Sequence, residues 1–62
     1  MKRLDGQTIL VTGATGAIGQ AICRELVADG ARVVIHFANN RKVAASLLAE
    51  LKGYGWCIQA DL

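Results

Sequence analysis

The sequence predicts an α/β fold in which parallel strands alternate with helices. Three observations predict it. A short apolar run, Ile9-Leu10-Val11, leads into a glycine-rich turn, a stretch with apolar residues at helical spacing follows the turn, and a second apolar run, Arg32 to Phe37, follows that stretch. Nearly continuous apolar runs are typical of parallel strands that are covered on both faces. The order of elements is therefore expected to be β-α-β-α-β.

The first strand is expected over Thr8 to Thr12, after the turn-like pair Asp5-Gly6. The turn that follows reads Thr12-Gly13-Ala14-Thr15-Gly16-Ala17-Ile18-Gly19. Glycines at these positions let the chain turn tightly, let its backbone approach an anion, and let the next helix pack close to the strand. The amides and dipole at a helix start favour a phosphate there. The turn therefore predicts a dinucleotide pyrophosphate site, and the alternative is a purely structural glycine turn.

The first helix is expected from about Ala17 to Asp29 and ends before Gly30, where a left-handed residue is typical. Its apolar stripe consists of Ile18, Ala21, Ile22 and Leu26. The second strand is expected over Arg32 to Phe37. These two elements complete a βαβ unit with the first strand.

The second helix is expected from about Asn40 to Lys52, with Asn39 or Asn40 as its N-cap and Gly53 as its terminator. Its buried stripe is predicted to be Val43, Leu47, Leu48 and Leu51. A short third strand is expected from about Trp56 to Ala60.

Parallel strands joined by helices take right-handed crossovers almost without exception. Both helices should therefore cover one face of a three-stranded parallel sheet ordered 3-2-1. Residues 1–62 are thus predicted to form one Rossmann-like half-domain, truncated relative to a complete one. Its opposite face and the outer edge of the first strand would be bare, so we expect self-association or a missing C-terminal half that covers them.

Composition excludes several classes. A formal charge of +2 over 62 residues, without a basic stripe, is too small for a nucleic-acid groove. Met1-Lys2-Arg3 is followed by Leu4-Asp5-Gly6-Gln7 and not by an apolar segment, so no signal peptide is expected. No apolar run approaches the roughly 18 residues of a membrane span. A soluble cytoplasmic protein is expected. Cys23 and Cys57 lack metal-ligand spacing and are expected to be free thiols, with a disulfide or a reactive site as the alternative.

The chain resembles the N-terminal half of a short-chain dehydrogenase/reductase. The resemblance rests on the lead-in from Leu4 to Val11, the glycine turn, the stretch from Gly30 to Ile35, and the terminal Ala60-Asp61-Leu62. It implies a doubly wound sheet that binds NAD or NADP. It also implies that the Asp61 side chain contacts the adenine amino group and that the Leu62 backbone lines the same pocket.

Two stretches resemble different branches of that family. The commonest pattern places glycine where this chain has Ala17, whereas Gly13, Gly16 and Gly19 follow the spacing of extended members. The stretch from His36 to Asn40 instead resembles reductases that read Asn-Tyr-Ala-x-x there. The resemblance therefore leaves the subfamily open, but both branches imply the same class of cofactor, NAD or NADP.

The end of the second strand favours NADP over NAD. NAD-binding members place there a carboxylate that accepts hydrogen bonds from the ribose and would repel a 2′-phosphate. Phe37 and Ala38 occupy those positions, and Asn39, Asn40 and Arg41 offer amide donors and a guanidinium to a phosphate. The alternative for Arg41 is a solvated residue in the first turn of the helix.

The predicted cofactor-binding residues fall into three groups. Gly13, Thr15, Ala17, Ile18 and Gly19 are expected at the pyrophosphate, Asn39, Asn40 and Arg41 near the adenosine ribose, and Asp61 and Leu62 at adenine. No metal site is predicted. His36 is expected to be structural or to line the pocket, with a cofactor contact as the alternative. Tyr54 and Trp56 are expected to be packing residues, with base stacking as the alternative.

No catalytic residue is predicted in this chain. The family's reductases use a serine and a Tyr-x-x-x-Lys pair, in which lysine lowers the tyrosine pKa. The single tyrosine, Tyr54, has Ile58 four positions on, and the single serine, Ser46, falls in the second helix. The parent is interpreted as an NADP-dependent oxidoreductase acting on a carbonyl or alcohol, and the chain as a fragment of it. The alternatives are a non-catalytic dinucleotide sensor and a self-associating structural piece.

Overall fold

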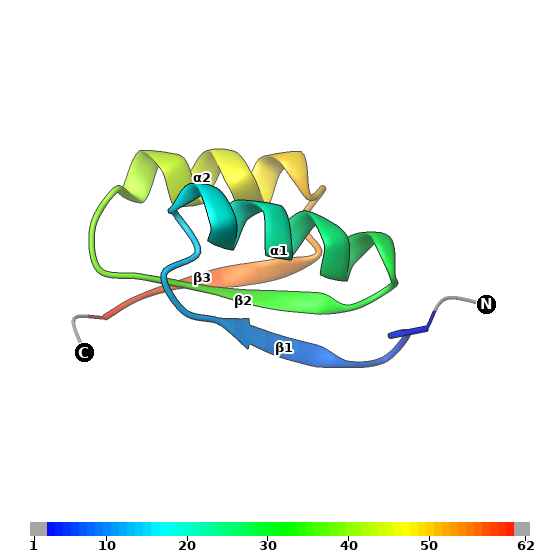
Figure 1. Ribbon diagram of the computed structural model, residues 1–62. Helices are drawn as coiled ribbons and strands as arrows, with labels where there is room; N and C mark the ends of the chain where they lie inside the picture. The colour runs from blue at the N-terminus through cyan, green and yellow to red at the C-terminus, as the bar shows by residue number, and fades with distance from the viewer. Residues whose placement is uncertain (1–2, 61–62) are drawn as a thin grey trace.

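The computed structural model describes residues 3–60, and its elements follow the expected order (Figure 1). The strands are β1 (Thr8–Val11), β2 (Arg32–Phe37) and β3 (Gly55–Gln59), and the helices are α1 (Ala17–Ala28) and α2 (Arg41–Glu50). β2 has the predicted bounds. The other elements begin or end one or two residues from the prediction, because cap residues such as Asn40, with φ of 66°, have already left helical geometry.

The sheet is parallel throughout, with β2 hydrogen-bonded to β1 on one side and to β3 on the other. This is the predicted 3-2-1 order. Both helices lie on the same face of the sheet (Figure 1), as two crossovers of one hand require. The carboxyl ends of all three strands gather at one edge, where the β1–α1 and β2–α2 connections also lie.

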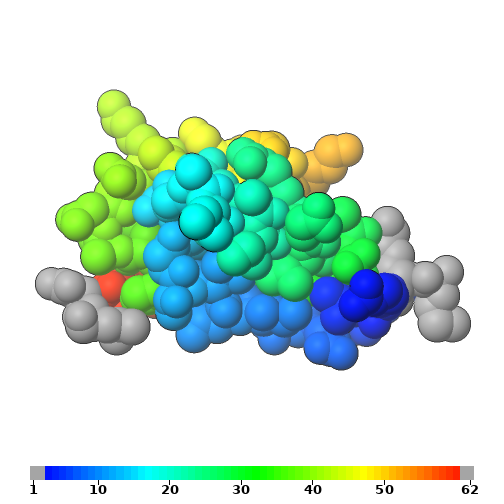
Figure 2. All heavy atoms as spheres, viewed as in Figure 1, coloured from blue at the N-terminus to red at the C-terminus, as the bar shows by residue number. Residues whose placement is uncertain are grey.

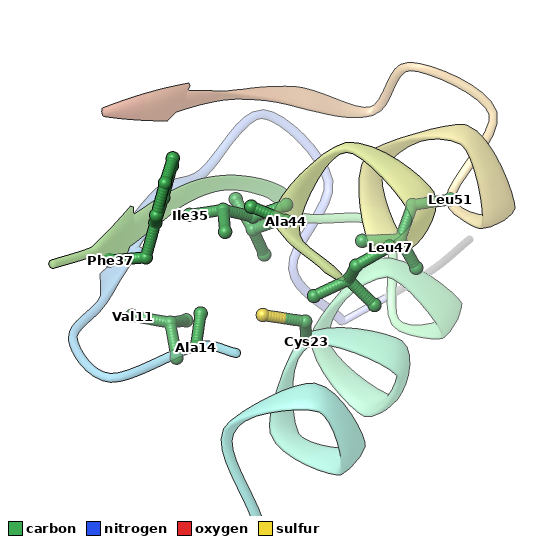
Figure 3. Close-up of a cluster of buried hydrophobic side chains, with 9 residues drawn as sticks. Val11, Ala14, Cys23, Ile35, Phe37, Ala44, Leu47 and Leu51 are labelled. Atoms are coloured by element: carbon green, nitrogen blue, oxygen red, sulfur yellow. The ribbon is translucent and has the colours of Figure 1, made fainter. Parts of the chain in front are cut away.

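The helix-covered face of the sheet carries the hydrophobic core. Val33 and Ile35 of β2 are fully buried, at 0% exposure. Cys23 of α1 and Leu47 of α2 meet these strand side chains in one cluster (Figure 3). Of the stripe predicted for α2, Leu47 and Leu51 are buried while Val43 and Leu48 are half-buried. The prediction missed Ala44, which is fully buried where α2 crosses the sheet.

The opposite face of the sheet is bare, as predicted. Alternate strand residues point to it, and the register aligns Leu10, Val34 and Trp56 in one row across the three strands. Leu10 is 59% exposed and Trp56 48%. Tyr54 and Trp56 are therefore not core packing residues, because no described element covers this face.

Three of the four residues in the apolar stripe predicted for α1 are exposed, namely Ile18, Ala21 and Ile22, and only Leu26 packs against the core. Ile18 is 78% exposed and Ile22 45%, whereas the buried residues of this helix are Gly19 and Cys23. Figure 2 shows α1 and β1 on the near side of the molecule with no other element in front of them. The side of α1 that packs on the sheet thus carries the small residues Gly19 and Cys23, with Leu26 and Val27 partly buried against the same core.

Both helices end in a left-handed residue. At α1 this is Gly30, with φ of 97°, and the amides of Gly30 and Ala31 donate back to Val27 and Leu26. At α2 the same position is Lys52, with φ of 58°, whose amide donates to the Ala49 oxygen at 3.0 Å. The prediction of Gly53 as terminator was therefore wrong by one residue.

Candidate functional site

The turn between β1 and α1 folds back over the end of β2. Gly13 has a φ of 62°, a left-handed conformation that costs glycine nothing. The Ala14 amide donates to the carbonyl oxygen of His36 at 3.1 Å, and the Gly16 amide donates to the Gly13 oxygen at 3.2 Å. The turn is thereby fixed at the carboxyl ends of β1 and β2, which is where open parallel sheets bind ligands.

Gly19 lets α1 pack directly against this turn. A Cβ atom at this position would lie 2.5 Å from the Gly13 oxygen and 2.7 Å from the Ala14 Cα. Both of those atoms belong to the backbone, so no side-chain rotation would relieve the contact. The third glycine is therefore required by packing, and α1 begins as close to the turn as a polypeptide allows.

The first turn of α1 presents amides that have no internal acceptor. The helical bonds begin with the Gln20 amide, which donates to the Gly16 oxygen at 2.9 Å. Within residues 3–60, the amides of Ala17, Ile18 and Gly19 find no acceptor. Gly16 supplies no side-chain cap, and the first turn contains no acidic residue. These donors and the positive end of the helix dipole are therefore available to an anion.

A side-chain hydrogen bond holds the tip of the turn. Nε2 of Gln20 donates to the carbonyl oxygen of Thr15 at 2.9 Å. Five residues predicted at the pyrophosphate are brought together in this single turn: Gly13, Thr15, Ala17, Ile18 and Gly19. The sequence did not single out Gln20, which lies in the first turn of α1, five residues after Thr15.

The segment after β2 lies at the same edge of the sheet. Phe37 is buried beneath the helices, and Asn39, Asn40 and Arg41 are exposed. Asn40 occupies the predicted N-cap position, but its backbone is left-handed and its side chain makes no capping hydrogen bond. No carboxylate lies between Phe37 and Arg41. The polar groups predicted near the adenosine ribose are thus together and accessible.

Gln59, at the end of β3, connects to this segment and was not among the predicted site residues. Its Oε1 accepts a hydrogen bond from Nη2 of Arg41 at 2.6 Å, and its Nε2 donates to the Ala38 oxygen at 3.2 Å. Arg41 and Gln59 border a hollow of about 290 Å³ beneath α2. A signal was present: the strand period places Gln59 on the helix-covered face, where a polar side chain is unusual.

His36 joins three segments of the site, as its structural prediction implied. Its Nε2 lies 2.9 Å from the Ala60 oxygen, so Nε2 carries the ring proton, since a carbonyl only accepts. Its own carbonyl receives the Ala14 amide. Among the described residues Nδ1 is buried without a partner. Ala60 leads directly to Asp61 and Leu62, the predicted adenine contacts, which lie outside the described residues.

A larger hollow, of about 700 Å³, lies at the opposite edge of the sheet. It is lined by the amino ends of the strands and includes Arg32, Tyr54 and Trp56. Tyr54 is therefore remote from the glycine turn, and Ser46 lies exposed on α2. Neither side chain takes part in the site at the carboxyl edge.

The two cysteines are free thiols. Burial raises the pKa of the Cys23 thiol, which the charge of Arg24 only partly offsets, and burial also raises the pKa of Cys57. Across residues 3–60, no three His, Cys, Asp or Glu side chains are grouped so as to hold a metal ion. Neither helix in this part of the chain has the length and apolarity needed to span a bilayer.

A family model described as short chain dehydrogenase matches residues 7–62. The chain belongs to this family. Versicolorin reductase stcU of Emericella nidulans is 46% identical over 97% of this chain, and versicolorin reductase 1 of Aspergillus parasiticus is 43% identical over 97%. The chain spans 24% of the length of each of these short-chain dehydrogenases.

Solved structures of short-chain dehydrogenases have the same fold. A promiscuous reductase of lugdunomycin biosynthesis, LugOII, matches with a TM-score of 0.91 at 34% identity, over 100% of this chain and 27% of its own. The landomycin C-6 ketoreductase LanV with bound NADP and rabelomycin matches with a TM-score of 0.90 at 34% identity, over 98% and 26%. A blue fluorescent protein from a metagenomic library, in complex with NADPH, matches with a TM-score of 0.88 at 37% identity, over 97% and 26%.

Proposed function

We propose that this chain binds the pyrophosphate and adenosine of NADP as part of a short-chain oxidoreductase that acts on a carbonyl or an alcohol. The observation that carries the proposal is the first turn of α1, where three amides without acceptors meet a turn packed against Gly19. Backbone N–H groups fit a phosphate because they donate without adding a flexible side chain. When bound, the cofactor supplies the hydride chemistry. This chain's own residues bind and orient its nucleotide end.

In this proposal, the turn residues from Gly13 to Gly19 bind the pyrophosphate, and Asn39, Asn40 and Arg41 bind the ribose and its 2′-phosphate. Asp61 and Leu62 remain the proposed adenine contacts. The absence of a carboxylate between Phe37 and Arg41 supports NADP over NAD. The relatives with bound NADP or NADPH support the same preference. A cytoplasmic location also belongs to the proposal, on the free thiols.

Ala17→Pro tests the pyrophosphate site. Proline at the first helical position is well tolerated, and Gly16 already has the extended ψ of 164° that precedes a proline comfortably. The substitution therefore removes one proposed phosphate donor with little strain. Calorimetric titration should show the affinities for NADPH and NADH both falling about tenfold or more. Ala17→Ser, which keeps the amide, is the matched control, and unchanged binding by the proline variant would refute the site.

Arg41→Ala tests the cofactor preference. A guanidinium that contacts the 2′-phosphate contributes a charge-assisted hydrogen bond, so the NADPH affinity should fall about tenfold or more and the NADH affinity should stay unchanged. Lys42→Ala removes the neighbouring cation from the same helix turn and should leave both affinities as they are. Equal losses for the two cofactors in the Arg41 variant would count against NADP.

The bare face of the sheet favours a second candidate function, self-association. Leu10, Trp56 and Ile58 expose 59%, 48% and 44% of their surface there. Large apolar side chains exposed together on one face of a sheet are typical of surfaces that pair with another chain. Sedimentation velocity of the full chain tests this candidate. A monomer at high micromolar concentration would rule it out, and Trp56→Lys should return any observed dimer to the monomer.

A dinucleotide sensor without turnover stays open as a further alternative, because Ser46 and Tyr54, the chain's single serine and tyrosine, lie away from the site. The downstream sequence of the parent discriminates the two. A Tyr-x-x-x-Lys pair would favour the enzyme, and its absence the sensor.

A further inference from the structure

The side chain of Gln59 holds Arg41 and the end of β2 at once. Its Oε1 receives Nη2 of Arg41 at 2.6 Å, and its Nε2 donates to the Ala38 oxygen at 3.2 Å. A guanidinium only donates and a carbonyl only accepts, so these two partners admit a single orientation of the amide. Gln59 is paired with Phe37 in the sheet, so the bridge starts from a rigid strand.

This bridge restricts a side chain that would otherwise be mobile. An exposed arginine loses considerable rotamer entropy when it binds a ligand, and a guanidinium already held in place loses less. The hydrogen bond to Gln59 uses one of its five N–H donors, and the others stay free for an anion. The bond to the Ala38 oxygen fixes the orientation of the Gln59 amide, and so the position of the oxygen that holds Arg41.

Arg41 differs from Arg24 because its hydrogen-bond partner, Gln59, carries no charge. The guanidinium of Arg24 is paired with the carboxylate of Glu50, at 2.5 Å from Nε to Oε2. Arg41 is held by an uncharged amide, and no ion pair with a described carboxylate is found for it. The positive charge of Arg41 is therefore oriented without being neutralised. A guanidinium in this state is suited to bind an anion such as the 2′-phosphate.

We propose that Gln59 is a positioning residue that sets the preference for NADP over NAD by aiming Arg41 at the 2′-phosphate. The inference rests on the proposed function, and it assigns to β3 a part in cofactor choice. A glutamate at this position would hold Arg41 as an ion pair and repel the phosphate. A leucine would leave the guanidinium free to rotate.

Titration of the full chain with NADPH and NADH, in parallel, tests the inference. Gln59→Leu should weaken NADPH binding about 3- to 10-fold, the usual contribution of one side-chain hydrogen bond, and leave NADH binding unchanged. Gln59→Glu should weaken NADPH binding further, because it adds a negative charge beside the phosphate. The NADPH loss in this variant should shrink as salt is added, since the repulsion is exposed to solvent.

Gln20→Leu is the matched control. It removes the same kind of bond, from a glutamine amide to a backbone oxygen, but in the turn proposed to bind the pyrophosphate. Because both cofactors share that group, this variant should weaken NADPH and NADH equally. The ratio of the two dissociation constants therefore separates cofactor choice from general damage to the site.

A double-mutant cycle with Arg41→Ala separates positioning from structure. If Gln59 acts through Arg41, Gln59→Leu should have no further effect on NADPH binding once Arg41 is alanine. Equal losses for NADPH and NADH in Gln59→Leu, or a full loss in the Arg41→Ala background, would overturn the inference. An NADPH preference that depends on Arg41 but not on Gln59 would leave the proposed function intact. Failure of the wild-type chain to bind either cofactor would overturn both.

Discussion

The contact between Gly19 and the glycine turn gives a prediction whose size follows from the structure. A Cβ placed on Gly19 lies 2.5 Å from the Gly13 oxygen, whereas real Cβ contacts essentially never fall below 3.0 Å, so the turn or the helix must move by at least about 0.5 Å. Overpacking of this kind costs about 1–3 kcal/mol. Alanine is better than glycine within a helix by about 1 kcal/mol, which offsets part of the cost.

Gly19→Ala should therefore destabilise the fold by up to about 2 kcal/mol and lower the unfolding temperature by roughly 4–8 °C per kcal/mol lost. It should also weaken NADPH and NADH binding about tenfold, because the displaced backbone carries the proposed phosphate donors. Thermal unfolding by circular dichroism and calorimetric titration measure the two effects.

Gly16→Ala provides the comparison for this prediction. Its Cβ would meet the Gly13 oxygen at 3.6 Å, an ordinary contact, and its φ of −74° suits any residue. Only the weaker capping by alanine remains, at about 0.5 kcal/mol. If Gly19→Ala unfolds at the same temperature as Gly16→Ala and binds NADPH like the wild type, the packing argument for the third glycine is refuted.

Three further predictions concern the rest of the fold. Alkylation of the native chain at mildly alkaline pH should label Cys57 well before Cys23, because Cys23 is fully buried and labels only on unfolding; equal rates by mass spectrometry would contradict the burial. The ion pair with Arg24 lowers the pKa of Glu50, so its small stabilisation should be complete above the ordinary glutamate pKa and disappear as pH falls through the lower, folded-state value. Denaturant titrations of wild type and Glu50→Gln should then converge at acid pH, and a gap that widens there would reverse the sign of this linkage. Lys52→Gly should raise the free energy of unfolding by about 0.5 kcal/mol. Glycine removes the steric cost of a left-handed lysine, but it also increases the entropy of the unfolded chain, which cancels part of that gain. A loss of stability would show that contacts of the lysine side chain outweigh this strain.

The glycine turn and the order of elements were predictable because both depend on local chemistry. Gly13, Gly16 and Gly19 have spacing that only a few turns require, and β2 is a run of apolar residues with clear ends. Strand order followed from the handedness of crossovers, which is nearly invariant.

The face of α1 was not predictable from its apolar pattern. Ile18 and Ile22 define a stripe by hydrophobicity, but the contact with the turn is too close for either, and Gly19 and Cys23 occupy it. The spacing of apolar residues along a helix shows which of its faces is apolar. It does not show which surface packs against that face. Three of the four stripe residues predicted for α1 are exposed, whereas all four predicted for α2 are buried or half-buried.

The bridge at Gln59 was missed for a different reason. Its partners, Arg41 and Ala38, lie 18 and 21 residues away in sequence and become neighbours only through the pairing of β3 with β2. The strand period could have marked Gln59 as an unusual polar residue on the helix-covered face, but it could not have named these partners. The left-handed residue that ends α2, Lys52, was also missed, because the glycine that follows it is the residue type expected to end a helix.

The row formed by Leu10, Val34 and Trp56 has a practical consequence. Trp56 is the chain's single tryptophan and occupies one end of that row, half exposed, with no described element above it. Its emission is therefore a built-in optical reporter of whatever settles on the sheet. A second copy, or a longer stretch of the parent chain, would shift that emission to shorter wavelength as it excludes water, while a cofactor at the opposite edge would leave the wavelength unchanged. One intrinsic signal thus distinguishes covering of the sheet from filling of the nucleotide site.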